Sequence, residues 1–248
     1  MKIHCYPKEP ELAAAVGEYI IGFIRENPRS LLCFAGGDTP VPVYRLLVEA
    51  ARLKQVDFQE CRFVGLDEWV GIHPNEPGSC RYLLDQELFK PLGIPEERIC
   101  FFNGVAGDLE HECDKINSFV ENHGPIDLML LGIGVNGHLG FNEPGSSFQS
   151  FAHRVDLEEV TCEVGQKYFS QARKLSRGIT LGLAQIRQSR SAVLMAGGPK
   201  KAAIINKLIH SEISAELPAS ILKSHLDSHL FMDEAAGPEI TKEFRNNP

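Results

Sequence analysis

The sequence predicts a single α/β domain over residues 1–248, in which helices cover both faces of a mostly parallel, doubly wound sheet. Short β-rich apolar runs alternate with longer segments of helical composition or spacing, a pattern typical of βαβ units. Short loops rich in glycine and proline fall where the strands should end. The chain has no low-complexity linker or internal repeat, and its 248 residues suit one large α/β domain or two small ones.

The predicted elements place strands and helices in a largely alternating order. The first thirty or so residues are expected to hold one short strand and one helix. Five apolar runs are predicted to be buried strands: Leu31–Ala35, Arg62–Leu66, Leu128–Gly132, Ala192–Ala196 and Leu230–Met232. Five further segments are predicted to be helices: Glu9–Glu26, Val41–Leu53, Cys80–Phe89, Leu109–His123 and Pro199–His210.

The composition favours a soluble cytoplasmic enzyme or sensor. The formal net charge of −8 argues against a nucleic-acid partner, because binding a nucleic-acid backbone requires clustered Lys and Arg. Seven scattered cysteines without a CxxC pair suit reduced thiols in a cytosolic protein. We find no signal segment and no apolar run long enough to span a bilayer, so we expect no membrane partner.

Three polar loops follow predicted strands, at Gly36–Pro40, Asp67–Gly71 and Gly134–Gly145. Doubly wound folds bind ligands outside the carboxyl ends of their strands, where the strand order reverses. The shared position of the loops therefore predicts that they converge on one cleft.

The first loop has the features of a phosphate cradle. Gly36 and Gly37 precede a predicted helix, whose free N–H groups can bind an anion together with the Thr39 hydroxyl. The alternative is an ordinary glycine-rich turn, since the loop matches neither a P-loop nor a dinucleotide fingerprint. Asp38 would repel a phosphate unless it points away or binds a sugar hydroxyl.

The second loop places Asp67 and Glu68 at the end of an apolar strand, next to Trp69, the only tryptophan. Burial against an aromatic ring would raise the pKa of a carboxyl group and make it a base near neutrality. The alternative is that Asp67 caps the next turn and that Glu68 is solvated.

The third loop gathers Asn136, His138, Asn142 and Glu143 among four glycines. A carboxylate there could orient an imidazole that moves a proton. One His and one Glu make a poor zinc set, so we expect no metal. The alternative is a glycine-rich turn whose histidine bonds a backbone carbonyl.

A lysine follows another predicted strand. Lys201 comes after Gly197 and Gly198 and begins a predicted helix, where its ammonium group can reach a phosphate in the cleft. The alternative is that Lys200 and Lys201 are both solvated surface lysines.

The third loop resembles the signature of the glucosamine-6-phosphate deaminase family. The matching motif is Gly134-x-Asn136-Gly137-His138-x-Gly140-Phe141-Asn142-Glu143-Pro144. Other segments fit the family in the same order: Thr39-Pro40, Leu66–Gly71, Gly178–Gly182, Gly198-x-x-Lys201-Ala202 and Pro218–Ser220. The resemblance covers about residues 30 to 235.

The resemblance implies a Rossmann-like α/β fold and an aldose–ketose isomerisation coupled to loss of ammonia from a 2-amino-sugar 6-phosphate, with no cofactor. Asp67 matches the family's enolisation base and His138 its ring-opening group. The residues that match assisting groups are Asn136 and Glu143, and those that match phosphate contacts are Thr39, Lys201 and the glycines Gly36 and Gly37. Some segments, such as Pro77–Cys80, also resemble the galactosamine-6-phosphate isomerase branch.

The chain departs from the family pattern at several positions. Asn136 stands where many members have Asp, so it can form hydrogen bonds but cannot stabilise an imidazolium by charge. Lys167 stands where a phosphate-binding Arg is usual and lacks its bidentate fork. Within Gly145–Val155 only Arg154 carries a formal positive charge, whereas the resemblance implies several basic groups near there in allosteric hexameric members. A homo-oligomer is compatible with the sequence.

Two other functions fit parts of the sequence. A 6-phosphogluconolactonase-like hydrolase would share the fold and the Gly-His step, although the full Gly140–Pro144 segment favours the deaminase. A non-catalytic sugar-phosphate-sensing module would need a DNA-binding unit, for which the residues before the first long strand leave little room.

Overall fold

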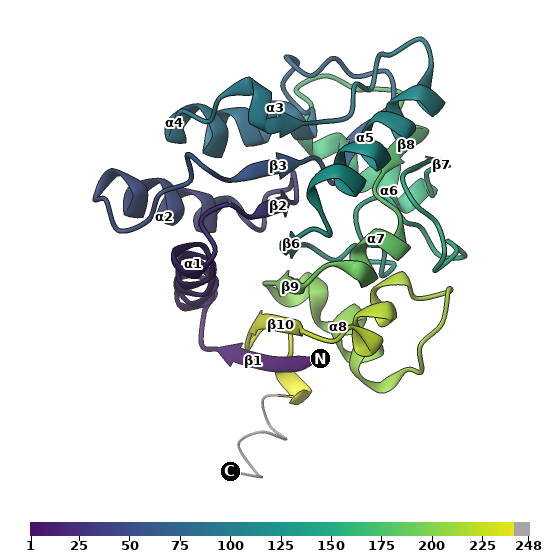
Figure 1. The fold of residues 1–248 in the computed structure, drawn as a ribbon. Coiled ribbons are helices and arrows are strands. Elements are labelled where there is room, and N and C mark those ends of the chain that lie inside the picture. Colours follow the sequence, from purple (N-terminus) through teal and green to yellow (C-terminus); the bar gives the residue numbers. More distant parts are fainter. Residues whose placement is uncertain (241–248) are drawn as a thin grey trace.

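The computed structural model describes residues 1–240, so the last eight residues of the predicted domain lie outside its description. A seven-stranded sheet forms the centre of the molecule, and each neighbouring pair of its strands is parallel (Figure 1). The strand order is β1 (Lys2–Tyr6), β10 (Ser228–Asp233), β9 (Ser191–Ala196), β6 (Leu128–Leu131), β2 (Leu31–Phe34), β3 (Arg62–Val64) and β5 (Ile99–Cys100).

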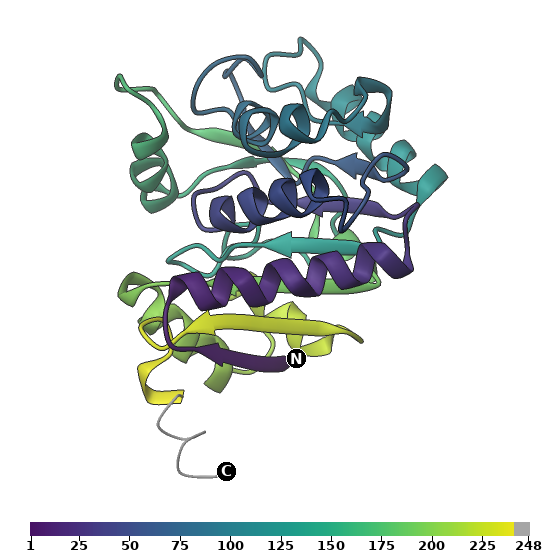
Figure 2. The same ribbon diagram turned by 90° about the vertical axis from the view of Figure 1, so that its left-hand side faces the viewer.

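Helices cover both faces of this sheet, which confirms the predicted fold class. One face carries α1 (Glu9–Glu26), α2 (Val41–Arg52), α3 (Cys80–Leu84) and α4 (Lys90–Leu92). The opposite face carries α5 (Leu109–His123), α7 (Leu183–Gln188) and α8 (Ala202–His210). Figure 2 shows α1 and α2, in purple and blue, in front of the sheet and running roughly along its strands.

Alternating side chains of the strands feed two separate cores. Leu32 and Phe34 of β2 pack with Leu12 of α1 in the first core. Cys33 of β2 points the other way and packs in the second core with Ile205 of α8. Because both faces of the sheet are buried at its centre, β2, β6 and β9 are nearly continuous apolar runs, and this is why they could be predicted.

A second, smaller sheet was not predicted. It contains β4 (Asp67–Trp69), β8 (Arg177–Thr180) and β7 (His153–Asp156) in that order, all antiparallel. The prediction of a loop at Asp67–Gly71 was therefore wrong for its first three residues, since Asp67 pairs with Thr180. The helix α6 (Glu159–Gly165) and a 3₁₀ turn, Gln166–Tyr168, connect β7 to β8.

The helix predictions were accurate to within one residue except at Cys80–Phe89 and at Pro199–His210, whose first three residues form a 3₁₀ turn. The bounds of α1 and α5 match the predicted ones. The predicted helix Cys80–Phe89 divides into α3 and a π-helical turn at Asp85–Phe89, and α4 continues beyond its predicted end. Pro91 has no N–H for the carbonyl of Glu87, and the N–H of Lys90 donates to Asp85, five residues back.

Short 3₁₀ turns complete the fold. They lie at Glu96–Arg98, Pro199–Lys201 and Pro218–Ser224, and the second of them leads directly into α8. Of the helices within residues 1–240, none combines the length and the apolar composition needed to cross a membrane.

The strand order reverses between β2 and β6. From β2 the chain proceeds outward through β3 to β5, and from β6 it proceeds the other way through β9 to β10. The carboxyl ends of β2 and β6 are joined by a hydrogen bond of 2.9 Å from the N–H of Ala35 to the carbonyl of Leu130. The first and third polar loops therefore start side by side, at the position where such folds bind ligands.

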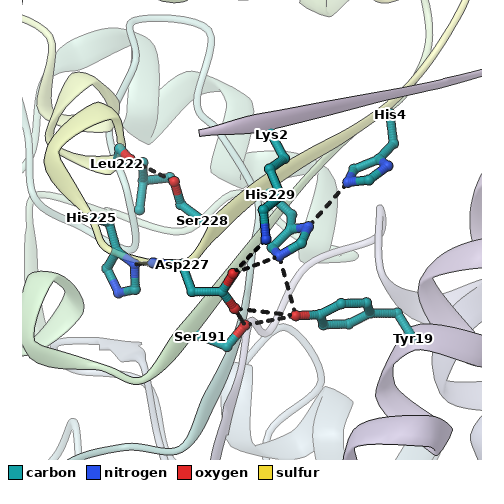
Figure 3. A network of polar contacts seen from close by, with 9 residues as sticks. All are labelled: Lys2, His4, Tyr19, Ser191, Leu222, His225, Asp227, Ser228 and His229. Atoms are coloured by element: carbon teal, nitrogen blue, oxygen red, sulfur yellow. Dashed lines mark hydrogen bonds and ion pairs between the residues drawn. The ribbon is translucent and has the colours of Figure 1, made fainter.

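A polar network holds the edge strand β1 at the amino ends of the strands (Figure 3). The carboxylate of Asp227 accepts hydrogen bonds from Lys2 at 3.0 Å, from Ser191 at 2.9 Å and from His229 at 3.1 Å. His229 also contacts His4 of β1, with 3.0 Å between ring nitrogens. These contacts join β1, β9 and β10 at the end of the sheet opposite the polar loops.

Replacing Asp227 with asparagine should lower the free energy of unfolding at pH 7 by about 1 kcal/mol, a small effect because the carboxylate is partly exposed and screened. Burial alone would raise the pKa of Asp227, but hydrogen bonds from Lys2, Ser191 and His229 outweigh it and lower the pKa to about 2. A carboxylate with a depressed pKa stabilises the fold fully above its unfolded pKa of about 4 and loses this contribution as the pH falls. Urea unfolding from pH 7 to pH 2 should therefore show the two proteins converging below pH 4. A constant difference down to pH 2 would contradict this assignment.

Candidate active site

The polar loops surround a cleft of about 190 Å³ at the carboxyl ends of β2 and β6. Residues from α6 and the turn that follows it close the cleft on the side of the small sheet. Of the nine residues predicted for the site, seven line this cleft: Gly36, Gly37, Thr39, Asp67, His138, Lys167 and Lys201. The other two, Asn136 and Glu143, belong to the same loop as His138 and contact this residue and each other.

One end of the cleft is suited to an anion. The glycine-rich loop with Thr39 lies at this end and leads into α2. A side chain at Gly36 would place its Cβ 2.6 Å from the Cβ of Cys80, so the backbone can approach α3 only without one. Lys201 donates to the carbonyl of Ile133 at 2.5 Å. Burial, together with the charge of Lys167, lowers the pKa of Lys201.

Asp38 forms an ion pair with Lys167. The distance from Lys167 Nζ to Asp38 Oδ2 is 2.7 Å, and both side chains are at least half exposed. The same Nζ atom lies 4.7 Å from the centre of the Tyr168 ring. The sequence predicted that Asp38 would either point away from a phosphate or bind a sugar hydroxyl, and it did not predict this ion pair. The charge of Lys167 offsets the repulsion that the Asp38 carboxylate would exert on a bound anion.

Adjacent residues Asp67 and Glu68 point in opposite directions, as strand geometry requires. Glu68 is completely buried, so the alternative of a solvated side chain is wrong. Its carboxylate accepts hydrogen bonds from the hydroxyl of Ser79 at 2.7 Å and from the N–H groups of Trp69, Cys80 and Arg81 at 2.9 to 3.0 Å. Glu68 therefore holds the start of α3 against β4.

The carboxyl group of Asp67 lines the cleft and is only 8% exposed. Burial, and next the negative charge of Glu68, raises the pKa of Asp67 to about 7, against a hydrogen bond from the Cys80 thiol that lowers it. Trp69 and Phe141, whose rings lie 4.5 Å apart, line the cleft nearby. A carboxyl group with this pKa can accept and return a proton near neutral pH.

His138 lies flat against the backbone of Gly134, where an added Cβ would meet its ring at 2.5 Å. Its Nδ1 atom lies 3.4 Å from Glu143 Oε2 and 3.2 Å from Thr161 Oγ1. Within residues 1–240 these side-chain contacts all involve Nδ1, which leaves Nε2 for a ligand in the cleft. The ring thus contacts a carboxylate, as a proton relay requires, and not a backbone carbonyl.

Glu143 is buried and surrounded by donors. Burial raises its pKa, but hydrogen bonds from His138, Thr161 and Asn136 outweigh this effect, and the net pKa is lowered. Glu143 therefore stays ionised at neutral pH. Asn136 acts on this carboxylate and on the backbone N–H of His138, which its Oδ1 atom accepts at 3.3 Å.

Sequence reasoning missed four residues that contribute to the site: Cys80, Glu158, Thr161 and Tyr168. Thr161 lies in α6, Glu158 immediately precedes this helix and Tyr168 ends the turn that follows it. The seven residues of α6 carry too little periodicity to be predicted as a helix facing the third loop. Cys80 follows Ser79, which caps α3. This cap indicates where the helix begins, but it does not indicate a contact between Cys80 and Asp67.

A family model described as glucosamine-6-phosphate isomerases/6-phosphogluconolactonase matches residues 8–231. The chain therefore belongs to this family of sugar-phosphate enzymes, as the third loop predicted.

Relatives of known name support this placement over nearly the whole chain. The glucosamine-6-phosphate deaminase of Geobacillus sp. (strain WCH70) is 38% identical over 91% of this chain and 90% of its own. The deaminase of Thermoanaerobacter sp. (strain X514) is 35% identical over 98% and 96%. The structure of a monomeric glucosamine-6-phosphate deaminase superposes with a TM-score of 0.92 at 34% identity, covering 95% and 98% of the two chains. A 6-phosphogluconolactonase from Thermotoga maritima, 20% identical with a TM-score of 0.75 over 94% and 100%, shares the fold.

Replacing Cys80 with alanine should raise the pKa of Asp67 further, because the thiol hydrogen bond that lowers it is lost while burial and Glu68 remain. Titration of the Asp67 carboxyl carbon by NMR measures the change directly. Cys80→Ser, which keeps a donor, should show a smaller increase than Cys80→Ala. Equal pKa values of Asp67 in the wild type and in Cys80→Ala would show that the thiol does not act on this carboxylate.

Proposed function

We propose that this protein converts a 2-amino-2-deoxyhexose 6-phosphate into the ketose 6-phosphate and ammonia. The substrate is glucosamine-6-phosphate, which gives fructose-6-phosphate, or its galactosamine equivalent. The observation that carries the proposal is the placement of Asp67, a carboxyl group with a pKa of about 7, in the same cleft as His138. Identities of 35 to 38% to deaminases over more than nine-tenths of the chain support the substrate class.

Ring opening comes first, because a cyclic amino sugar has no acidic proton at C2. His138 transfers a proton from O1 to O5 of the sugar through Nε2 and so releases the open-chain aldehyde. Glu143 and Thr161 hold Nδ1 on the other side of the ring. The ionised Glu143 stabilises the imidazolium that forms during the transfer.

Isomerisation follows at Asp67. Its carboxylate removes the proton at C2, the electrons of that C–H bond form the C1–C2 double bond, and the aldehyde oxygen takes a proton from solvent to give an enolamine. Asp67 then returns its proton to C1, and the nitrogen releases a proton to solvent, which leaves an imine at C2. Addition of water to the imine releases ammonia and leaves the ketose.

The anion-binding end of the cleft holds the 6-phosphate. Gly36, Gly37 and Thr39 line the cleft together with Lys201, so the backbone N–H groups of the glycines, the Thr39 hydroxyl and the Lys201 ammonium group are the donors for it. Lys167 would exchange its ion pair with Asp38 for the phosphate. We also propose that residues 1–248 act as one domain in the cytoplasm. The prediction that a homo-oligomer can form stays untested. A structural relative of this chain is a monomeric deaminase.

The direct test is to measure ammonia release from glucosamine-6-phosphate and galactosamine-6-phosphate side by side. The proposal predicts ammonia in stoichiometric amounts with ketose phosphate from at least one of them. Acid release from 6-phosphogluconolactone without ammonia would favour the hydrolase. Tight binding of both amino sugars without turnover would favour the sensing module.

Replacing Asp67 with asparagine should reduce kcat by about 10²- to 10⁴-fold, the usual contribution of one general base. The variant should also stop exchanging the C2 proton of the substrate with solvent, which proton NMR in D₂O follows. The wild-type unfolding curve serves as the control for folding. A folded Asp67→Asn protein that exchanges this proton at the wild-type rate would refute the assignment.

Replacing Lys201 with alanine should raise KM by about 10- to 100-fold, the loss expected for one charge-assisted hydrogen bond to a phosphate. The value of kcat should change less, because the phosphate is remote from C1 and C2. Steady-state kinetics give both constants. A large fall in kcat at unchanged KM would place Lys201 at the reacting carbons instead.

A further inference from the structure

The side-chain amide of Asn136 binds two carboxylates at once. Its Nδ2 atom lies 2.8 Å from Glu143 Oε2 and 2.7 Å from Glu158 Oε2. Glu158 immediately precedes α6, and its own N–H donates to Glu143 Oε1 at 3.2 Å. The third loop and the start of α6 are therefore joined by two hydrogen bonds, one on each side of Glu158, and the bond between Asn136 and Glu143 lies within the loop.

The amide can make this double contact, whereas the carboxylate of an aspartate cannot. The Nδ2 group carries two hydrogens, one for each carboxylate. An aspartate at position 136 would accept but not donate, and it would bring a third negative charge into hydrogen-bond distance of Glu143 and Glu158. Asn136 and Glu158 are thus complementary in donor and acceptor character.

The contact lies next to the imidazole of the proposed proton relay. The same oxygen of Glu143 that accepts from Asn136 also faces His138 Nδ1 at 3.4 Å. Thr161, one turn into α6, contacts the same Nδ1 at 3.2 Å. A shift of α6 away from the third loop would therefore change both partners that hold the imidazole.

We propose that Glu158 is a positioning residue for His138, which acts through Asn136 and Glu143 by holding α6 against the third loop. This inference rests on the proposed function for its catalytic consequence only. Its structural consequence, the orientation and tautomer of the His138 ring, is independent of any substrate. Glu158 is exposed, so its effect is smaller than that of a buried partner.

The variants Glu158→Ala and Glu158→Gln separate hydrogen bonding from charge. Glutamine keeps an oxygen that accepts from Asn136, so its kcat/KM should stay within about threefold of wild type. Alanine removes the acceptor, and kcat should fall about 3- to 30-fold with little change in KM. The matched control is Glu159→Ala, which removes the neighbouring exposed carboxylate of α6 and should leave kcat unchanged.

Exchanging the donor and the acceptor gives the sharpest comparison. Asn136→Asp alone places three carboxylates together and should reduce kcat more than Glu158→Ala does. In Asn136→Asp/Glu158→Gln the glutamine supplies the donor, so kcat should recover about tenfold relative to Asn136→Asp. Recovery should be smaller in Asn136→Asp/Glu158→Ala, which relieves the repulsion but supplies no donor.

The nitrogen-15 chemical shifts of His138 provide a readout without substrate. In the wild type the contact of Nδ1 with Glu143 should favour the tautomer with hydrogen on Nδ1, and Glu158→Ala should shift the population toward Nε2 while Glu159→Ala should not. Unchanged shifts in Glu158→Ala, or no recovery in the exchanged double variant, would overturn the inference. If no amino sugar is turned over but the shifts move as expected, the proposed function fails and the positioning role stands.

Discussion

Four hydrogen bonds converge on the carboxylate of Glu68, which is completely buried between β4 and the start of α3. A buried carboxylate without such donors would cost several kcal/mol, so β4 and α3 must be placed together for either to be stable. Because side chains alternate along a strand, burying Glu68 on this side turns Asp67 toward the cleft. The position of Asp67, the proposed base, thus follows from the hydrogen bonds that hold the neighbouring Glu68.

The same contact sets the chemical character of the base. Burial and the charge of Glu68 both raise the pKa of Asp67, and a hydrogen bond from the Cys80 side chain lowers it. Glu68 also positions Cys80, because its carboxylate accepts a hydrogen bond from the backbone N–H of Cys80. Behind His138, Glu143 accepts enough hydrogen bonds for its pKa to fall. Two carboxyl groups whose pKa values move in opposite directions are what an acid–base mechanism with two separate proton transfers needs.

The sequence predicted what is encoded locally. The central strands are apolar runs because both faces are buried, and the glycine-rich loops mark the ends of β2 and β6. The small sheet escaped prediction because β4 is only three residues long and carries two carboxylates. The contacts of Cys80 with Asp67 and of Glu158 with Asn136 join residues 13 and 22 positions apart, and only the folded chain brings them together. The pairing of Asp38 with Lys167 likewise required the position of the segment after α6.

The central claim is that a buried carboxyl group with a pKa near neutrality does the enolisation, and the pH dependence of kcat/KM tests it most directly. A base must be ionised to accept a proton, so kcat/KM should fall about tenfold per pH unit below an apparent pKa of about 7. An acid limb near pH 4, the value of an ordinary exposed aspartate, would contradict the account.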